Sequence, residues 1–343
     1  MRSIVPGFVL VTALALATSS SAQSAPPETL TLADIANRPE RWAPAVKLGR
    51  DFDFGSGTRA GTGQSVQVLE FNGANVVVDA GNGLVFEIAP GDCNLLEASN
   101  AAWKTLTPAQ RAIDAALLKK DASLWPERTK CSAGFLLDGG GELAPDLEYD
   151  FLSFGDDGVK LYATEQRTVL YAELAQTDAI ARARERALVE PAKRSARIVA
   201  ALKGALVGPD GKAAAPANLE SAEYFVLYYG ASWCGPCRKF SPRLVEFMKA
   251  NAANPKLFAV LMSNDEEDAD MLEYMKEEKM PWPALPLSKL QSTPTLLGYT
   301  IGSIPNLVVV DRHGMVLASS VRSGSYVGPD SALDALKKLL AAR

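Results

Sequence analysis

Two cysteines separated by two residues stand between a predicted strand and a predicted helix in the last third of the chain. Residues 224–229 form an apolar, aromatic run typical of a buried strand, and the residues after Cys234 have the apolar spacing of an amphipathic helix. A thiol at a helix N-terminus faces unpaired N–H groups and the positive end of the helix dipole, which lower its pKa. Cys237 follows about one turn later on the same face, so the two sulfurs can close a disulfide. The spacing predicts a redox centre with Cys234, at the exposed helix tip, as the nucleophile.

A zinc site is the alternative use of such a cysteine pair. Zinc needs further Cys or His ligands, and the rest of the chain offers Cys93, Cys131 and His313, none of them in paired spacing. We interpret His313 as a turn residue in a hairpin. We therefore expect no metal at this site, and no other cofactor.

The motif Trp233-Cys234-Gly235-Pro236-Cys237 is also that of the thioredoxin family, which this region of the chain resembles. Pro242 matches the proline that kinks the family's active-site helix, and Ile304-Pro305 looks like the family's cis-proline loop. The resemblance implies a set of substrate-binding residues beside the sulfurs: Trp233, Gly235, Pro236, Ile304 and Pro305.

Within that family, the chain is most similar to the nucleoredoxin and tryparedoxin branch. Three segments carry this likeness: residues 231–234 together with 241–242, the acidic run 263–267 and the run 280–286, which begins Met280-Pro281-Trp282-Pro283. Thioredoxins place a buried aspartate where this chain has Tyr228, whereas nucleoredoxin-like members have an aromatic residue there. The usual base is thus absent. Asp265 or Glu266 either replaces it through water or, as we favour, caps and solvates the following helix.

Strands and helices alternate from Leu206 to the C-terminus. Strands are expected at 224–229, 256–262, 307–310 and 315–318, and helices after Cys234, at 267–279 and at 331–340. This order is the thioredoxin arrangement, an α/β fold with a central mixed sheet and helices on both faces.

The region ahead of this domain is rich in short strands separated by glycine turns, which predicts small antiparallel barrels. Phe71 is matched by Phe154 and Val76 by Val159, and the separation along the chain is the same for both pairs (154 − 71 and 159 − 76). We interpret this as a duplicated barrel, the alternative being chance agreement of two β-rich segments. The pattern resembles the small bacterial SH3-like barrels found ahead of thioredoxin domains.

Helices are predicted between the two copies, at 94–103 and 108–120, and after the second copy, at 179–190 and 192–206. The arginines of the last two helices form either a surface for an acidic partner or, as we favour, a solvated helix face. Cys93 and Cys131 flank the first pair of helices. They either form a structural disulfide, which we favour and which would stabilise by about 3 to 4 kcal/mol, or remain buried thiols.

Residues 1–22 have the features of a secretory signal peptide: Arg2, an apolar stretch at 4–17 and small residues at 20–22. An uncleaved N-terminal anchor is the alternative. We expect export to a periplasm or the cell exterior, where disulfides persist, and no stable membrane insertion after cleavage. The predicted division is a signal peptide (1–22), a first barrel (28–92), a helical connector (93–127), a second barrel (128–176), linker helices (177–205) and a thioredoxin-like domain (206–343).

These features together predict an exported thiol–disulfide oxidoreductase. A Gly-Pro pair between the cysteines is typical of reducing thioredoxins, so we expect protein disulfides as substrates and a separate thiol as electron donor. The net charge of −5 over 343 residues argues against nucleic acid as a partner. The alternative is an envelope binding or scaffold protein in which the barrels recognise a polymer or protein.

Overall fold

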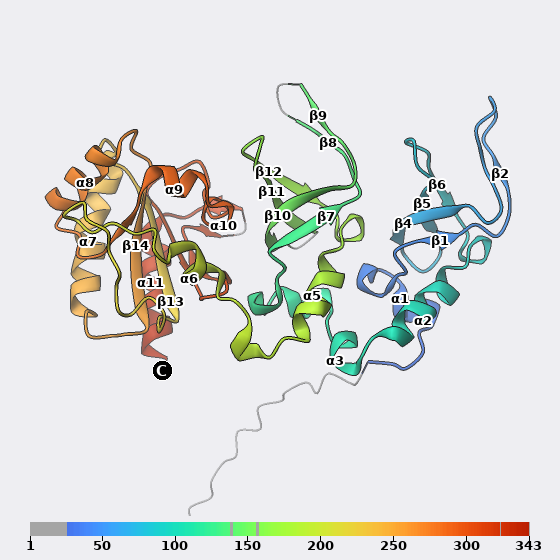
Figure 1. The fold of residues 1–343 in the computed structure, drawn as a ribbon, viewed down its shortest axis with the longest axis horizontal. Helices are drawn as coiled ribbons and strands as arrows, with labels where there is room; N and C mark the ends of the chain where they lie inside the picture. The colour runs from blue at the N-terminus through green and yellow to red at the C-terminus, as the bar shows by residue number, and fades with distance from the viewer. Residues whose placement is uncertain (1–25, 138–139, 156–157, 323, 343) are drawn as a thin grey trace, which may run out of the picture.

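The computed structural model describes residues 26–137, 140–155, 158–322 and 324–342. Three units follow one another along the molecule in Figure 1, a blue and then a green strand-rich unit and an orange to red C-terminal unit. The predicted signal peptide, residues 1–22, lies outside the described residues. Within the ranges given above, no helix has both the length and the apolar character needed to cross a membrane.

The first unit is built on an antiparallel sheet with the strand order β1-β4-β5-β6. Val66 and Val68 face the core by alternation along β4, and a shift of register between Val68 and Glu70 brings Phe71 to the core as well. Its helices and strands are α1 (Leu32–Ile35), β1 (Val46–Lys47), β2 (Phe52–Asp53), β3 (Arg59–Ala60), β4 (Ser65–Phe71), β5 (Val76–Asp79), β6 (Val85–Ile88) and α2 (Leu95–Thr105).

The second unit repeats this order with the sheet β7-β10-β11-β12. Its elements are α4 (Ala115–Leu118), β7 (Arg128–Cys131), β8 (Phe135–Leu136), β9 (Glu142–Leu143), β10 (Leu147–Phe154), β11 (Val159–Ala163), β12 (Thr168–Ala172) and α5 (Ala179–Ala187). The offset along the chain between Phe71 and Phe154 is also the offset between the starts of α1 and α4. The starts of β2 and β8 are separated by the same offset. The structure thus repeats, element by element, the offset found in the sequence. The likeness to SH3 barrels stays a prediction.

One tryptophan contact is common to both copies. The Trp42 indole N–H donates to the Ile35 carbonyl at 2.7 Å, and the Trp125 indole N–H donates to the Leu118 carbonyl at 2.6 Å. Donor and acceptor are each displaced by the same offset between the copies. Trp125 is buried and Trp42 is half-buried, and in each copy this bond ties the short helix to the chain that follows it.

The single helix predicted at 108–120 is wrong. The structure has two short helices, α3 (Pro108–Arg111) and α4. The Asp114 side chain accepts the Leu117 N–H at 2.7 Å and so caps a new helix where the pattern suggested a continuous one. The two linker helices predicted at 179–190 and 192–206 are both present but shorter: they are α5 and, beyond Pro191, α6 (Arg197–Leu202).

Arg184 and Arg186 form neither a solvated helix face, as we favoured, nor a free surface for an acidic partner. Arg184 donates to the carbonyls of Glu40 and Gln110, and burial lowers its pKa to about 10. Arg186 donates to the Ser123 carbonyl at 2.8 Å. These side chains satisfy carbonyl groups of neighbouring segments, so they join units of the molecule and do not form a solvated face.

The C-terminal unit contains a mixed sheet with the strand order β15-β14-β13-β16-β17. The central strand β13 runs parallel to β14 and antiparallel to β16. The bounds are β13 (Tyr224–Gly230), α7 (Gly235–Ala250), β14 (Leu257–Ser263), α8 (Asp268–Glu277), β15 (Ala284–Leu285), α9 (Leu287–Gln291), α10 (Pro294–Leu297), β16 (Asn306–Val310), β17 (Val316–Ser319), β18 (Val321–Arg322), β19 (Ser325–Tyr326) and α11 (Pro329–Ala341).

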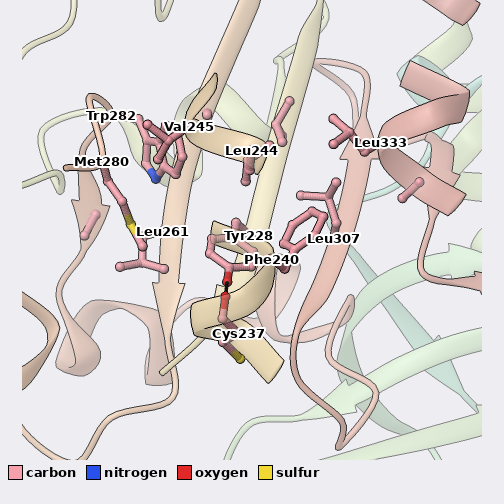
Figure 2. Close-up of a cluster of buried hydrophobic side chains, with 14 of the residues drawn as sticks. Tyr228, Cys237, Phe240, Leu244, Val245, Leu261, Met280, Trp282, Leu307 and Leu333 are labelled. Carbon is pink, nitrogen blue, oxygen red and sulfur yellow. Dashed lines mark hydrogen bonds between the residues drawn. The ribbon is translucent and has the colours of Figure 1, made fainter. Parts of the chain in front are cut away.

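Every residue of β13 is buried because the sheet is covered on both faces. Tyr228 faces a cluster made with α7, α8 and α11, part of which Figure 2 shows, and Tyr229 faces a second cluster made with α6, α9 and α10. The thioredoxin fold predicted for the C-terminal domain is therefore confirmed. The small hairpin β18–β19, which no sequence pattern indicated, is an addition to the predicted order.

Candidate active site

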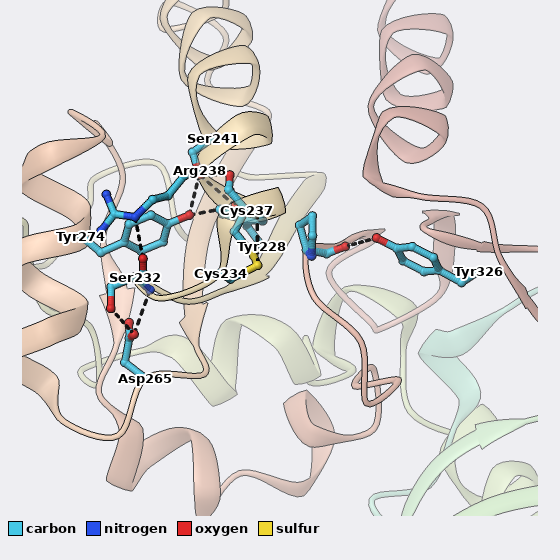
Figure 3. Close-up of a disulfide and its surroundings, with 10 residues drawn as sticks. Tyr228, Ser232, Cys234, Cys237, Arg238, Ser241, Asp265, Tyr274 and Tyr326 are labelled. Atoms are coloured by element: carbon cyan, nitrogen blue, oxygen red, sulfur yellow. Dashed lines mark hydrogen bonds between the residues drawn. A yellow bond between two sulfur atoms is a disulfide. The ribbon is translucent and has the colours of Figure 1, made fainter.

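The end of β13 and the start of α7 place the two cysteines at the edge of the sheet. Cys234 is the N-cap of α7, and its sulfur accepts the Cys237 backbone N–H at 3.2 Å. The cysteines form a disulfide with their Cα atoms 5.1 Å apart (Figure 3). The helix start therefore supplies an N–H group to the sulfur of Cys234, which favours the thiolate form once the disulfide is opened.

Cys234 is less accessible than the prediction of an exposed helix tip suggested. It is 4% exposed, whereas Cys237 is fully buried. The exposed surface beside it belongs to Trp233, which is 67% exposed, and to Gly235 and Pro236. These residues thus form the exposed surface beside the disulfide, and Cys234 is the sulfur nearer to solvent.

The loop before β16 carries the predicted substrate-binding pair. The Ile304–Pro305 peptide bond is cis, and Ile304 packs against the cluster that contains both cysteines. The Pro305 carbonyl accepts a hydrogen bond from the Tyr326 hydroxyl at 2.7 Å, as Figure 3 shows. Tyr326 lies on β19, so the added hairpin β18–β19 holds this loop. The sequence offered no signal for this contact.

A cluster of three buried hydroxyl groups lies under Cys237, where thioredoxins have an aspartate. The Tyr228 hydroxyl lies 2.9 Å from the Ser241 Oγ and 3.1 Å from the Tyr274 hydroxyl, and the last two are 2.6 Å apart. Ser241 also donates to the Cys237 carbonyl at 3.0 Å. Burial raises the pKa of Tyr228 and of Tyr274, so both phenols stay neutral and neither can act as a base at neutral pH.

Asp265 holds the turn that precedes Cys234. Its carboxylate accepts the backbone N–H and the hydroxyl of Ser232, both at 2.8 Å, and the Ser263 hydroxyl at 2.6 Å. The favoured interpretation of Asp265 as a cap for the next helix is wrong, because the N-cap of α8 is Glu267 and makes no capping bond through its side chain. The nearby Glu266 is exposed.

Arg238 is a further polar group at this edge that the sequence did not single out. Its Nε donates to the Ser232 carbonyl at 2.6 Å, and its guanidinium pairs with Glu277 at 2.8 Å. Ser232 is therefore hydrogen-bonded at both ends, to Asp265 through its N–H and to Arg238 through its carbonyl. Within the described ranges, no three His, Cys, Asp or Glu side chains gather in a way that could hold a metal ion.

The predicted disulfide between Cys93 and Cys131 is wrong, because both are free thiols in the structure. The repeat explains why. Cys93 forms an isolated bridge with Leu48 in the first copy, and Cys131 forms one with Thr177 in the second. Leu48 and Cys131 are equivalent positions of the repeat, so the two bridges are the same contact made once in each copy. Each thiol therefore packs in the core of its own copy and does not face the other. Burial raises the pKa of both thiols.

His313 lies between β16 and β17, in the turn where the sequence placed it. Its Nδ1 is 3.3 Å from the Ser195 carbonyl, so its ring faces the linker. The histidine thus takes part in the contact between the linker and the C-terminal unit.

Comparisons with known proteins agree with this geometry. The protein-family model described as thioredoxin-like matches residues 222–316. Tryparedoxin of Trypanosoma brucei brucei is 39% identical over 109 residues, which are 31% of this chain and 74% of the relative. Nucleoredoxin of Xenopus laevis is 32% identical over 123 residues, which are 35% of this chain and 29% of the relative.

Among solved structures, tryparedoxin I of Crithidia fasciculata is similar at 30% sequence identity, covering 36% of this chain and 85% of its own, with a TM-score of 0.31. The C-terminal domain carries the mixed sheet, the cysteine pair at the start of α7 and the family match, and 74% of the T. brucei tryparedoxin is covered at 39% identity. The chain therefore belongs to the thioredoxin-like family of thiol–disulfide oxidoreductases.

Proposed function

We propose that this chain is an exported oxidoreductase that reduces disulfides in other proteins through Cys234 and Cys237. The observation that carries this proposal is the position of the pair: Cys234 receives an N–H group at the start of α7 and lies nearer to solvent, while Cys237 is buried behind it. This arrangement supports attack by Cys234 and resolution by Cys237.

In the proposed reaction, the Cys234 thiolate attacks one sulfur of a substrate disulfide. A mixed disulfide forms, and the other substrate sulfur leaves as a thiolate that takes up a proton. Cys237, once deprotonated, attacks the Cys234 sulfur and releases the second substrate thiol. The substrate gains two electrons, and the protein is left with the Cys234–Cys237 disulfide seen in the structure, which a separate thiol donor must reduce.

The surroundings of the sulfurs fit a substrate that arrives as an extended chain. Trp233, Gly235 and Pro236 are exposed on one side of the disulfide, and Ile304 and Pro305 belong to the loop held by Tyr326. As the family resemblance implies, we assign these residues to substrate binding. The neutral hydroxyl cluster under Cys237 supplies no general base, so deprotonation of Cys237 depends on solvent that enters with the substrate or on the departing thiolate.

Reduction of insulin with dithiothreitol as donor tests the proposal. Wild type should accelerate precipitation of the insulin chains, and Cys234→Ser should reduce the rate to that of dithiothreitol alone, because the attacking thiolate is gone. Cys93→Ser is the matched control, since it removes a thiol outside the site, and should keep the wild-type rate. Equal rates for wild type and Cys234→Ser would remove the proposed activity.

Export is the second part of the proposal and rests on the sequence of residues 1–22. We expect the intact mass of the protein recovered from a bacterial periplasm or culture medium to lack these residues. A mass that retains them, or a protein found only in the cytoplasm, contradicts export while leaving the redox activity untouched.

A further inference from the structure

The second copy of the repeat contacts the segment that leads to Pro305. α10 lies against β10, and Figure 1 shows the green sheet next to this end of the C-terminal unit. Leu152 of β10 is 5% exposed and packs on Gly298, where a Cβ atom would lie 3.1 Å from a Leu152 methyl group. Glycine at 298 thus permits a close approach that a larger residue would push apart.

A lysine of the second copy completes this contact. The Lys160 ammonium donates to the Gly298 carbonyl at 2.6 Å, and burial lowers the pKa of Lys160. Lys160 and Leu152 also line a cavity of about 190 Å³ together with Thr300 and Ile301. A charged donor in such a place makes a stronger bond to a carbonyl than a neutral one does.

The C-terminal domain holds the same segment from its other side. The Tyr229 hydroxyl donates to the Leu296 carbonyl at 2.6 Å, and the Asn306 side chain donates to the Tyr299 carbonyl at 3.1 Å. Carbonyls 296, 298 and 299 are therefore each fixed by a side chain, the middle one from the second copy. The exposed residues 300–303 follow directly and lead to Ile304, which is half-buried.

The first copy supplies a comparison within the same chain. The counterparts of Leu152 and Lys160 at the repeat offset are Leu69 and Val77, and both are only half-buried. The leucine is thus common to both copies, whereas the lysine is found in the copy that contacts the redox domain.

We infer that Lys160 is a positioning residue for the substrate-binding loop 300–305, so that the second copy forms part of the redox site. Lys160 acts through Gly298: it fixes the start of the exposed loop whose end lies beside the sulfurs. The inference rests on the proposed function, since it concerns the binding of a protein disulfide. A substrate that needs the loop should depend on Lys160, and a small disulfide that reaches Cys234 without it should not.

The test compares Lys160→Met with Lys130→Met, a matched control because Lys130 lies exposed in the same copy and pairs with Asp146 at 3.1 Å. With insulin, Lys160→Met should raise KM about fivefold at unchanged kcat, as expected for loss of one charge-assisted hydrogen bond. With the small disulfide 5,5′-dithiobis(2-nitrobenzoate), it should match wild type. Lys160→Arg should restore most of the insulin KM, and amide hydrogen exchange in residues 299–306 should be faster in Lys160→Met alone.

A pair of variants tests the packing independently of the lysine. Gly298→Ala should raise the insulin KM because the new methyl group displaces Leu152, and adding Leu152→Ala should bring KM back towards wild type. Strictly additive effects overturn the inference, as does a Lys160→Met protein that equals Lys130→Met in insulin KM or in hydrogen exchange. A wild type that reduces neither disulfide is a different result, because it removes the proposed function itself.

Discussion

Ser232 is the residue on which the geometry before Cys234 depends. Asp265 binds its N–H and hydroxyl, and Arg238 binds its carbonyl. The turn contains no proline or glycine between Ala231 and Cys234, so side chains that follow β14 and begin α7 fix its shape. Its rigidity therefore comes from hydrogen bonds to charged groups, which are stronger than neutral ones.

Asp265→Ala should destabilise the C-terminal domain by about 3 kcal/mol, because Ser232 and Ser263 lose their charged acceptor in a buried place. The rate of insulin reduction should fall with it, since the turn carries Cys234. Urea unfolding followed by tryptophan fluorescence measures the first effect. Glu266→Ala, in the exposed neighbour, should stay within about 0.5 kcal/mol of wild type. A similar loss in both variants would mean that Asp265 has no special role.

The cysteine pair could be predicted from the sequence because its chemistry is local: the strand, the turn and the helix that position it are contiguous. The hydroxyl cluster could not. Tyr228 was noted only as the place of a missing acid, and its partners Ser241 and Tyr274 lie on two different helices. Tyr326 was missed for the same reason, since its bond to Pro305 depends on a hairpin that no periodicity marks.

At the scale of elements, the 3₁₀ turn η1 (Pro39–Arg41) buries a carboxylate between the two copies. Glu40 is 6% exposed, and burial raises its pKa above the ordinary value. A carboxyl group whose pKa is raised on folding contributes stability below its unfolded pKa, and this contribution is lost as the pH rises through the folded pKa. At neutral pH the charged form of Glu40 therefore opposes folding.

Glu40→Gln should raise the unfolding midpoint of the N-terminal units at pH 7 and have a smaller effect at pH 4, where the wild-type carboxyl is largely protonated. Thermal unfolding followed by circular dichroism at the two pH values measures this difference. Glu97→Gln, on the exposed face of α2, is the matched control and should change neither midpoint. An equal gain at both pH values would show that charge is not the cause.

Element types were predictable where one strong pattern covered a whole segment, as in β13, α7 and the strand-rich copies. Predictions failed where a helix cap divides an apolar pattern. The run 108–120 is apolar enough for one helix, but Asp114 caps a second start, and the resulting α4 takes the place that α1 has in the first copy. The position of this short helix thus follows from the repeat, and a prediction made from a few neighbouring residues does not take the repeat into account.

At the scale of the molecule, buried arginines join the units. Arg197 on α6 is 7% exposed and donates to the carbonyls of Phe151 and Leu152 in the second copy. The next residue, Ile198, belongs to the core of the redox domain and donates its N–H to the Arg312 carbonyl. Neighbouring residues of one short helix thus hold two units together.

Arg197→Met should weaken this junction by about 2 kcal/mol, because two carbonyls lose a charged donor while the apolar stem is kept. In calorimetry, we expect the variant to unfold in more clearly separated steps than wild type, since the second copy and the redox domain then support each other less. Arg243→Met, which removes an exposed ion pair with Asp330 between α7 and α11, should keep the wild-type profile. Identical profiles for both variants would argue against a junction at Arg197.

The duplicated strand order also bears on how the chain avoids errors while it folds. Because the two copies share the same strand order, a strand of one copy can pair wrongly with a strand of the other during folding, a known failure of tandem domains. Gln67 faces Asp79 across the first sheet, and Asp150, the counterpart of Gln67, faces Tyr162 across the second. If β10 paired with β5, Asp150 would stand opposite Asp79, and like charges directly opposite are destabilising. The difference between Gln67 and Asp150 thus disfavours an exchange of strands and keeps each copy to its own partners.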